Sequence, residues 1–264
     1  MVIRLLIRRS ARENKKTRDS QDGFQDGSQD GPGEIYNEFQ LDIEGNETVL
    51  KALDRVKREQ DPSLVYRSSC HHGSCGTCGC RINDAERLAC ITTISDTLGD
   101  DAGTPIDVPV VKIEPLKKGI SIADIAVGPE ELIGNFPKDW SYVRESEVQS
   151  ATEDLSGEVS REASVEKYTR FEDCIECGLC VSACPMEGDF FGPAVLAAYG
   201  REGQKQPEKW VEIRDLIHTE QGVWGCEEAF ECSKVCPTWV YPSRHIVDMK
   251  RLLRPAKKAG SEDE

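Results

Sequence analysis

The feature that most constrains this chain of 264 residues is the arrangement of its twelve cysteines, which fall into two groups. Five lie between Cys70 and Cys90, and seven lie between Cys174 and Cys236. The start, MVIRLLIRRS, is too short and too basic to be a secretory signal. A disulfide framework is therefore not expected, because reducing compartments keep thiols free and use clustered cysteines for metal binding or catalysis. The two groups predict two metal-binding domains in a cytoplasmic protein.

The most specific pattern lies in the second group, in the segment CIECGLCVSACP. It runs from Cys174 to Pro185 with the spacing C-x2-C-x2-C-x3-C-P. In such a run three closely spaced thiolates bind one iron–sulfur cubane, while the fourth binds a different cluster. The pattern therefore requires a second run elsewhere in the chain.

That second run is GCEEAFECSKVCP, in which Ala229 stands where the same spacing expects a cysteine. A cubane corner without a thiolate is expected to lose its iron, so the two runs predict a [4Fe–4S] and a [3Fe–4S] cluster. The alternative is a labile iron that binds water or hydroxide beside Ala229, although alanine has no group to orient such a ligand. The predicted [4Fe–4S] ligands are Cys174, Cys177, Cys180 and Cys236, and the predicted [3Fe–4S] ligands are Cys184, Cys226 and Cys232.

The first cysteine group has a different spacing, C-x4-C-x2-C-x11-C. Its members are Cys70, Cys75, Cys78 and Cys90. A [2Fe–2S] cluster needs four thiolates around two irons, and a short loop supplies three of them only if its backbone wraps closely around the sulfides. Gly73, Gly76 and Gly79 permit this wrapping, because glycine adopts positive φ and has no Cβ to meet the cluster. We therefore predict a [2Fe–2S] site whose fourth ligand comes from a following strand.

Two other interpretations of this loop were weighed. Zinc sites usually pair two short C-x2-C knuckles, which is not the spacing here. His71 and His72 suggest a Rieske-type centre, but four cysteines already complete the ligand set. The remaining thiol, Cys80, is interpreted as a buried cysteine that binds no iron.

The residues before this loop predict an N-terminal β-grasp ferredoxin of the plant type, in an α+β fold. Val2 to Arg8 and Ile35 to Ile43 favour two paired strands, separated by a polar insert at about 10–33 that contains QDGFQDGSQDGP. From Asn46 an amphipathic helix follows, with Asn46 or Thr48 as its cap. Its predicted buried face is Val49, Leu50, Leu53 and Val56. The segment IDVPVVKIEP, after the loop, predicts a further strand.

The C-terminal part predicts a mostly α-helical, bacterial-ferredoxin-like domain with two clusters. Its expected helices are Leu196 to Tyr199, Trp210 to Ile217 and Ile246 to Leu253. The predicted organisation is a [2Fe–2S] domain at 1–127, a connecting segment at 128–165 and a two-cluster domain at 166–264.

The charge and hydropathy of the chain limit its partners. A net charge of −15 argues against nucleic acid, because phosphate binding needs a concentrated basic face. The charge is interpreted as a solubilising surface or as an adaptation to high salt. No apolar run approaches the roughly 20 residues that a membrane helix needs, so we expect a protein that is soluble or held at a membrane by partners.

One [2Fe–2S] site followed by an interleaved pair with one missing cysteine resembles the iron–sulfur subunit of succinate:quinone oxidoreductases, the succinate dehydrogenases and fumarate reductases. The likeness runs from about Val2 to Leu253. It includes SLVYRSSC, FFGPAVLAAY and GVWGC, and the last is similar to the fumarate reductase branch. MEGDFF replaces a loop that often holds tryptophan in the dehydrogenases, and Glu227 stands where histidine can occur.

This resemblance implies a peripheral subunit at the cytoplasmic face of the membrane. It lies between a FAD-containing flavoprotein and hydrophobic anchor subunits, with or without haem, and relays electrons between FAD and quinone in a direction set by the relative potentials. Pro185 and Lys250 match quinone-site positions of the family. A cation at Lys250 stabilises a reduced quinone oxygen in this interpretation, and the alternative is an exposed helix lysine.

Two other functions were considered. The same clusters can serve another flavoprotein without quinone, for example a thiol-dependent fumarate reductase or a glycolate-oxidase-like enzyme. Alternatively, the chain is a binding module in which the clusters only stabilise the fold. Three clusters favour electron transfer over a purely structural role, and the sequence offers no catalytic nucleophile or acid–base pair. We therefore expect a chain that conducts electrons for an oxidoreductase complex and holds no catalytic residue of its own.

Overall fold

The computed structural model describes residues 1–10, 35–44, 46–98, 108–128 and 173–254, and it divides the chain into two compact units, Met1–Gly128 and Pro129–Glu264. Each unit is described by itself below. The QDG-rich insert and the connecting segment, apart from their end residues, lie outside the described residues, as does the C-terminal tail.

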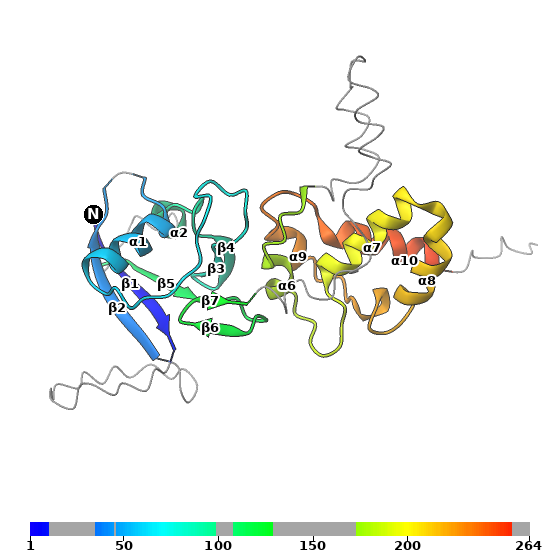
Figure 1. The fold of residues 1–264 in the computed structure, drawn as a ribbon, viewed down its shortest axis with the longest axis horizontal. Helices are drawn as coiled ribbons and strands as arrows, with labels where there is room; N and C mark the ends of the chain where they lie inside the picture. The colour runs from blue at the N-terminus through cyan, green and yellow to red at the C-terminus, as the bar shows by residue number, and fades with distance from the viewer. Residues whose placement is uncertain (11–34, 45, 99–107, 129–172, 255–264) are drawn as a thin grey trace, which may run out of the picture. The chain divides into compact units, whose positions relative to one another are not determined.

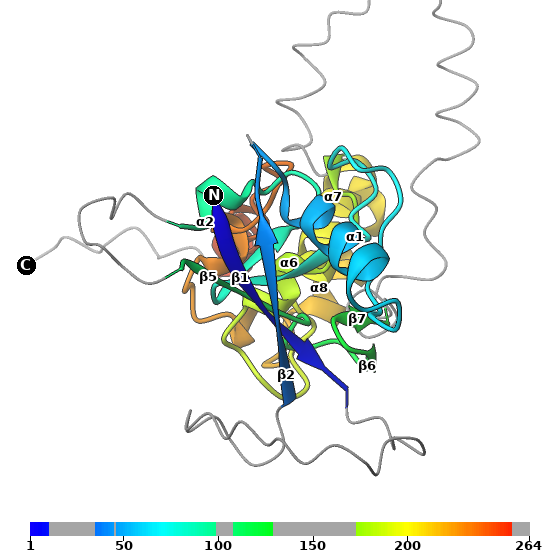
Figure 2. The same cartoon turned by 90° about the vertical axis from the view of Figure 1, so that its left-hand side faces the viewer.

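The first unit is built on a five-stranded sheet of order β2-β1-β5-β3-β4 (Figure 1). The strands are β1 (Val2–Arg9), β2 (Ile35–Asp42), β3 (Gly79–Ile82), β4 (Ala85–Leu88) and β5 (Val110–Glu114). β1 and β5 pair in parallel at the centre, and the other pairs are antiparallel. Figure 2 shows β1 and β2 side by side. Ile3, Leu5 and Ile7 alternate with more exposed residues along β1 and are fully buried, which is the period of two that a one-sided core imposes.

Helix α1 (Val49–Glu59) buries the predicted face, and Thr48 caps it by accepting a hydrogen bond from the Lys51 amide. The short helix α2 (Ile94–Thr97) follows the sheet's cysteine loop and begins with a capping box formed by Thr93 and Asp96. A small hairpin, β6 (Ser121–Ala123) with β7 (Ala126–Val127), ends the unit.

Charged side chains tie this hairpin to the rest of the first unit. Arg9, at the end of β1, makes ion pairs with Asp61 after α1 and with Asp124 in the hairpin turn. The Asp124 carboxylate also accepts hydrogen bonds from the amides of Ser10 and Val65, at 3.0 and 2.8 Å. The segment that leads into the first cysteine loop is thereby held to both β1 and the hairpin.

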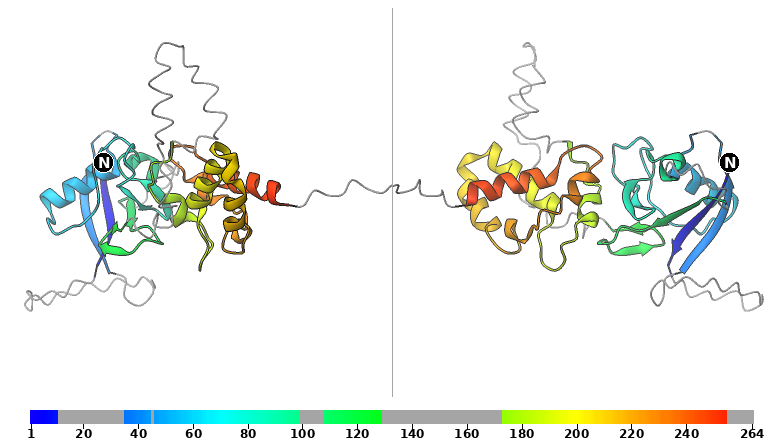
Figure 3. Two further views of the ribbon diagram at one scale, coloured as in Figure 1. Left: turned by 45° about the vertical axis from the view of Figure 1, so that its right-hand side comes forward. Right: turned by 180° about the vertical axis from the view of Figure 1, so that it is seen from behind.

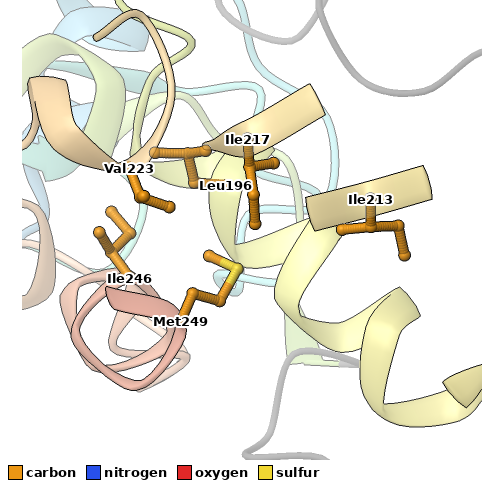
Figure 4. Packing of buried hydrophobic residues seen from close by; sticks show 6 residues of the cluster. All are labelled: Leu196, Ile213, Ile217, Val223, Ile246 and Met249. Atoms are coloured by element: carbon orange, nitrogen blue, oxygen red, sulfur yellow. The ribbon is translucent and has the colours of Figure 1, made fainter. Parts of the chain in front are cut away.

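The second unit is helical throughout its described part (Figure 3). Its elements are α6 (Leu179–Ala183), α7 (Pro193–Lys205), η2 (Pro207–Lys209), α8 (Trp210–Ile217), η3 (Val223–Gly225), α9 (Glu231–Lys234) and α10 (Pro242–Leu253). Apolar side chains of α7, α8, η3 and α10 form one core (Figure 4). They are Leu196, Ile213, Ile217, Val223, Ile246 and Met249.

Two of the predicted helices are longer than expected. α7 begins at Pro193 and continues past Tyr199 to Lys205, and two glycines in this stretch, Gly200 and Gly203, lie at close packing contacts. A Cβ on Gly203 would lie 2.4 Å from the Trp210 ring, and one on Gly200 would lie 3.3 Å from the sulfur of Met249. No described helix is both long and apolar enough to cross a bilayer.

Candidate iron–sulfur cluster sites

The loop of the first cysteine group turns through left-handed backbone at two glycines. Gly73 has φ +83° and Gly76 has φ +69°, and a Cβ on Gly73 would meet Ile91 at 3.1 Å. Gly79 instead begins β3, so its expected left-handed role was wrong. His71 also adopts positive φ, at 63°, which shows how tightly the loop is wound.

Hydrogen-bond donors converge on the first two sulfurs of this loop. The amides of Ser74 and His72 donate to Cys70 Sγ at 3.3 and 3.5 Å, and the Cys70 amide lies 3.5 Å from Cys75 Sγ. The hydrogen bond from the His72 amide, followed by that from the Ser74 side chain, lowers the pKa of Cys70 to about 5. Donors that favour a thiolate also suit a negatively charged iron–sulfur cluster, so these residues fit the predicted group.

The β3–β4 hairpin brings the other two cysteines of the group together. The Ala89 amide donates to the Cys78 carbonyl at 3.2 Å, so Cys90, one residue later, lies beside Cys78. Burial raises the pKa of the Cys90 thiol to about 12, which disfavours loss of its proton. A metal ion that binds a cysteine favours loss of the proton, because the ligand is the thiolate. Cys80 is buried in β3, where it lines a small space with Leu50 and Leu53 of α1.

In the second unit four cysteines line one cavity. They are Cys174, Cys177, Cys180 and Cys236. Glu176 and Gly178, with φ of 52° and 76°, turn the chain around this cavity just before α6. Burial raises the pKa of Cys174 to about 11 and that of Cys177 to about 12. Four thiols around a shared space match the donor set of a cubane cluster.

A second cavity is lined by three cysteines. They are Cys184, Cys226 and Cys232. Ala229 and Pro185 line the same cavity. Glu228 and Phe230, on either side of Ala229, both adopt left-handed backbone, with φ of 61° and 62°. Burial, followed by the neighbouring Cys184, raises the pKa of Cys232 to about 11.

Each of the two cavities takes one of its cysteines from the other sequence run. Cys184 ends the first run but lines the three-cysteine cavity, and Cys236 ends the second run but lines the four-cysteine cavity. Within the described residues no three His, Cys, Asp or Glu side chains are grouped tightly enough to hold a single metal ion.

Lys250, on α10, lies next to the three-cysteine cavity and is buried, with 8% of its side chain exposed. Its ammonium donates to the Cys226 carbonyl at 2.6 Å and to Glu228 Oε1 at 2.8 Å. The interpretation of Lys250 as an exposed helix lysine was therefore wrong. Sequence reasoning missed this ion pair, because its partners are separated by 22 residues. The hydrogen bond from Lys250 lowers the pKa of Glu228 below its usual value.

Both glycines of the GVWGC segment lie in close contact with the backbone of preceding residues. A Cβ on Gly222 would lie 2.1 Å from the Ile217 carbonyl oxygen, and one on Gly225 would lie 2.3 Å from that of Glu220. Any other residue at either position would push the turn away from the end of α8. These contacts set the point at which Cys226 enters its cavity.

Comparison with known families agrees with this geometry. Residues 22–133 match the family described as a 2Fe-2S iron-sulfur cluster binding domain, and residues 170–240 match the 4Fe-4S dicluster domain. Together with the cysteine-lined sites, these matches define an iron–sulfur protein with a [2Fe–2S] domain followed by a two-cluster domain.

Its relatives identify the family within that class. The chain is 32% identical to the fumarate reductase iron-sulfur subunit of Haemophilus influenzae, over 79% of this chain and 82% of that one. It is 31% identical to the Mycobacterium tuberculosis subunit of the same name, over 80% and 83%. A mitochondrial succinate dehydrogenase iron-sulfur subunit of Oryza sativa subsp. japonica is 29% identical over 77% and 70%. The chain belongs to the iron–sulfur subunits of the fumarate reductase and succinate dehydrogenase family.

Solved structures agree at the level of fold. A chain of the Mycobacterium smegmatis Sdh1 complex in the apo form superposes with a TM-score of 0.69 and 22% identity, covering 96% of this chain and 95% of that one. A hypothetical protein from Helicobacter pylori, of which 41% is covered, gives a TM-score of 0.55 at 11% identity.

Proposed function

We propose that this chain carries electrons one at a time between the FAD of a flavoprotein subunit and a membrane quinone. Its route is a plant-type [2Fe–2S] cluster in a β-grasp unit, then a [4Fe–4S] and a [3Fe–4S] cluster in a bacterial-ferredoxin-like helical unit. The observation that carries this proposal is the exchange of Cys184 and Cys236 between the two cavities, with Ala229 on the wall of the three-cysteine cavity. When bound, the clusters supply reversible one-electron chemistry.

Cysteines of this chain hold the proposed clusters. Eleven of the twelve cysteines are proposed ligands, in sets of four, four and three. The [2Fe–2S] set is Cys70, Cys75, Cys78 and Cys90; the [4Fe–4S] set is Cys174, Cys177, Cys180 and Cys236; and the [3Fe–4S] set is Cys184, Cys226 and Cys232. Backbone amides of His72 and Ser74 donate hydrogen bonds to the first site and stabilise its charge.

The quinone site is proposed to lie beside the three-cysteine cavity, at Pro185 and Lys250. Pro185 lines that cavity, and Lys250 is bonded to the loop that carries Cys226. An ammonium has three N–H groups and these contacts use two, so Lys250 can still donate to a quinone oxygen while holding the loop.

The partners are proposed from the family. They are a FAD-containing flavoprotein and hydrophobic anchor subunits, with or without haem, that hold this chain at the cytoplasmic face of the membrane. Mass spectrometry of the chains that co-purify with it tests this assignment. A small hydrophobic anchor is the expected result, and a large cysteine-rich partner with no anchor would favour a flavoprotein that does not use quinone.

The cluster assignment is tested by the substitution Ala229→Cys, which supplies the missing thiolate. The three-iron centre is expected to take up a fourth iron, and electron delivery to quinone is expected to slow. Iron analysis and electron paramagnetic resonance of the anaerobically isolated complex measure the change. Ala229→Val is the matched control, because it adds bulk without a thiolate and should leave three irons. Identical spectra and iron content in the cysteine variant and the wild type would show that Ala229 is not at the vacant corner.

A further inference from the structure

We propose that Thr77 and Thr238 tune the reduction potentials of two of the clusters, each by donating a hydrogen bond from its hydroxyl to the cysteine sulfur two residues earlier. Thr77 acts on Cys75 of the [2Fe–2S] site, and Thr238 acts on Cys236 of the [4Fe–4S] site. This inference rests on the cluster assignment proposed above.

The geometry is clearest at Thr77. Its hydroxyl oxygen lies 3.3 Å from Cys75 Sγ, and the residue is half-buried at the base of the loop. A cysteine bound to iron is a thiolate without a proton, so in the loaded protein the hydroxyl must be the donor. The same contact is the main cause of the lowered pKa of Cys75, with the backbone amides adding to it.

Thr238 repeats this arrangement in the helical unit. Its hydroxyl oxygen lies 3.8 Å from Cys236 Sγ, and the residue lines the four-cysteine cavity together with Pro237. The longer distance makes a weaker hydrogen bond, so its effect is expected to be smaller than that of Thr77.

The physical effect follows from charge. Reduction adds one electron, supplied by the flavoprotein, to the cluster, and no bond forms or breaks in the protein. The added negative charge is shared with the ligand sulfurs. A hydroxyl donor therefore stabilises the reduced form more than the oxidised form, and the midpoint potential rises.

The other cysteines provide internal comparisons. The three-cysteine set has no hydroxyl two residues after any member, where Met186, Glu228 and Lys234 stand. Thr92 occupies that position after Cys90, but its hydroxyl donates to the Leu88 carbonyl at 2.9 Å instead. The [3Fe–4S] signal is thus a reference within the same molecule, and Thr92→Val is a matched control.

The experiment is a potentiometric titration of the intact complex, in which electron paramagnetic resonance follows all three clusters. Thr77→Val should lower the midpoint of the [2Fe–2S] cluster alone, and Thr77→Ser, which keeps a hydroxyl, should restore it. Thr238→Val should lower the midpoint of the [4Fe–4S] cluster alone, by a smaller amount. Thr92→Val should leave every midpoint where it is in the wild type.

Several results would overturn this inference. They are an unchanged [2Fe–2S] midpoint in Thr77→Val, an equal shift of all three clusters, or a shift in Thr92→Val as large as that in Thr77→Val. A Thr77→Val chain that loads no [2Fe–2S] cluster would also contradict it, because the hydroxyl would then serve assembly. The number and type of cluster signals test the proposed function separately, since they do not depend on where the midpoints fall.

Discussion

Asp124→Asn should strongly destabilise the first unit while leaving the second unit intact. The Asp124 carboxylate is completely buried, lies 3.2 Å from Arg9 Nε and accepts the amide hydrogens of Ser10 and Val65. Asparagine keeps the shape of the side chain and tolerates the left-handed backbone of this turn, where φ is 49°. The substitution therefore removes mainly the charge and one of the acceptor oxygens.

The expected loss of unfolding free energy follows from the contacts that Arg9 and the two amides lose. Removing one partner of a buried ion pair costs about 3 to 5 kcal/mol, because the other charge stays buried. That range already includes the loss of one hydrogen bond from a backbone amide, and Asp61 still pairs with Arg9 in the variant. We therefore expect the unfolding free energy to fall by about 3 kcal/mol. In a unit of this size that loss lowers the melting temperature by on the order of 10 °C.

The assay is thermal unfolding of the cluster-loaded chain, followed through each cluster's own spectroscopic signal. The [2Fe–2S] signal should disappear at a lower temperature in the variant, while the signals of the second unit should be unchanged. Asp42→Asn is the control. In the described part of the chain its one ion pair joins the exposed N-terminus at 2.9 Å, and an exposed pair contributes at most about 1 kcal/mol.

Two outcomes would refute the reasoning. In the first, Asp124→Asn loses no more stability than Asp42→Asn, which would mean that the charge of Asp124 does not hold the hairpin to β1. In the second, the clusters of both units are lost together, which would mean that the effect is not confined to the first unit.

Two further substitutions test the loops that enter the cluster sites. Lys250→Gln should lower the unfolding free energy of the second unit by about 1 to 2 kcal/mol, since it removes the ion-pair partner of Glu228. The control is Lys234→Gln, which removes an exposed ion pair and should cost under about 1 kcal/mol. Equal urea midpoints in the two variants would contradict this prediction. Burial and the hydrogen bond to Asp54 raise the pKa of Tyr66 above its usual value near 10, so its contribution to stability is complete below pH 10 and is lost as the pH rises beyond it. Tyr66→Phe should therefore cost about 1 kcal/mol in urea unfolding at pH 8 and less at pH 10.5, and a deficit that stays constant would show that the phenol is not held in its neutral form.

Local patterns were predictable because the forces behind them act over a few residues. The buried face of α1 follows from apolar residues at helical spacing, and its cap from Thr48, so the expected helix from Asn46 agrees with the observed one. Trp210 to Ile217 was also predicted as a helix and is α8. Strand β3 was missed, since it is only four residues long and lies within the first cysteine group. The strand expected at the fourth ligand had no predicted bounds; it is β4, and Cys90 lies in the turn that follows it.

The sequence by itself determined the predicted chemistry, because cluster ligands come in short runs whose spacing is set by the size of the cluster. Ala229 was predicted to stand in place of a ligand for that reason alone. Only the tertiary structure decided which charges are buried and with whom. Lys250 meets Glu228 and Arg9 meets Asp124 across 22 and 115 residues, through packing that no local pattern encodes. The same packing decides where the hydroxyls of Thr77, Thr92 and Thr238 point, and therefore which of them reaches a sulfur.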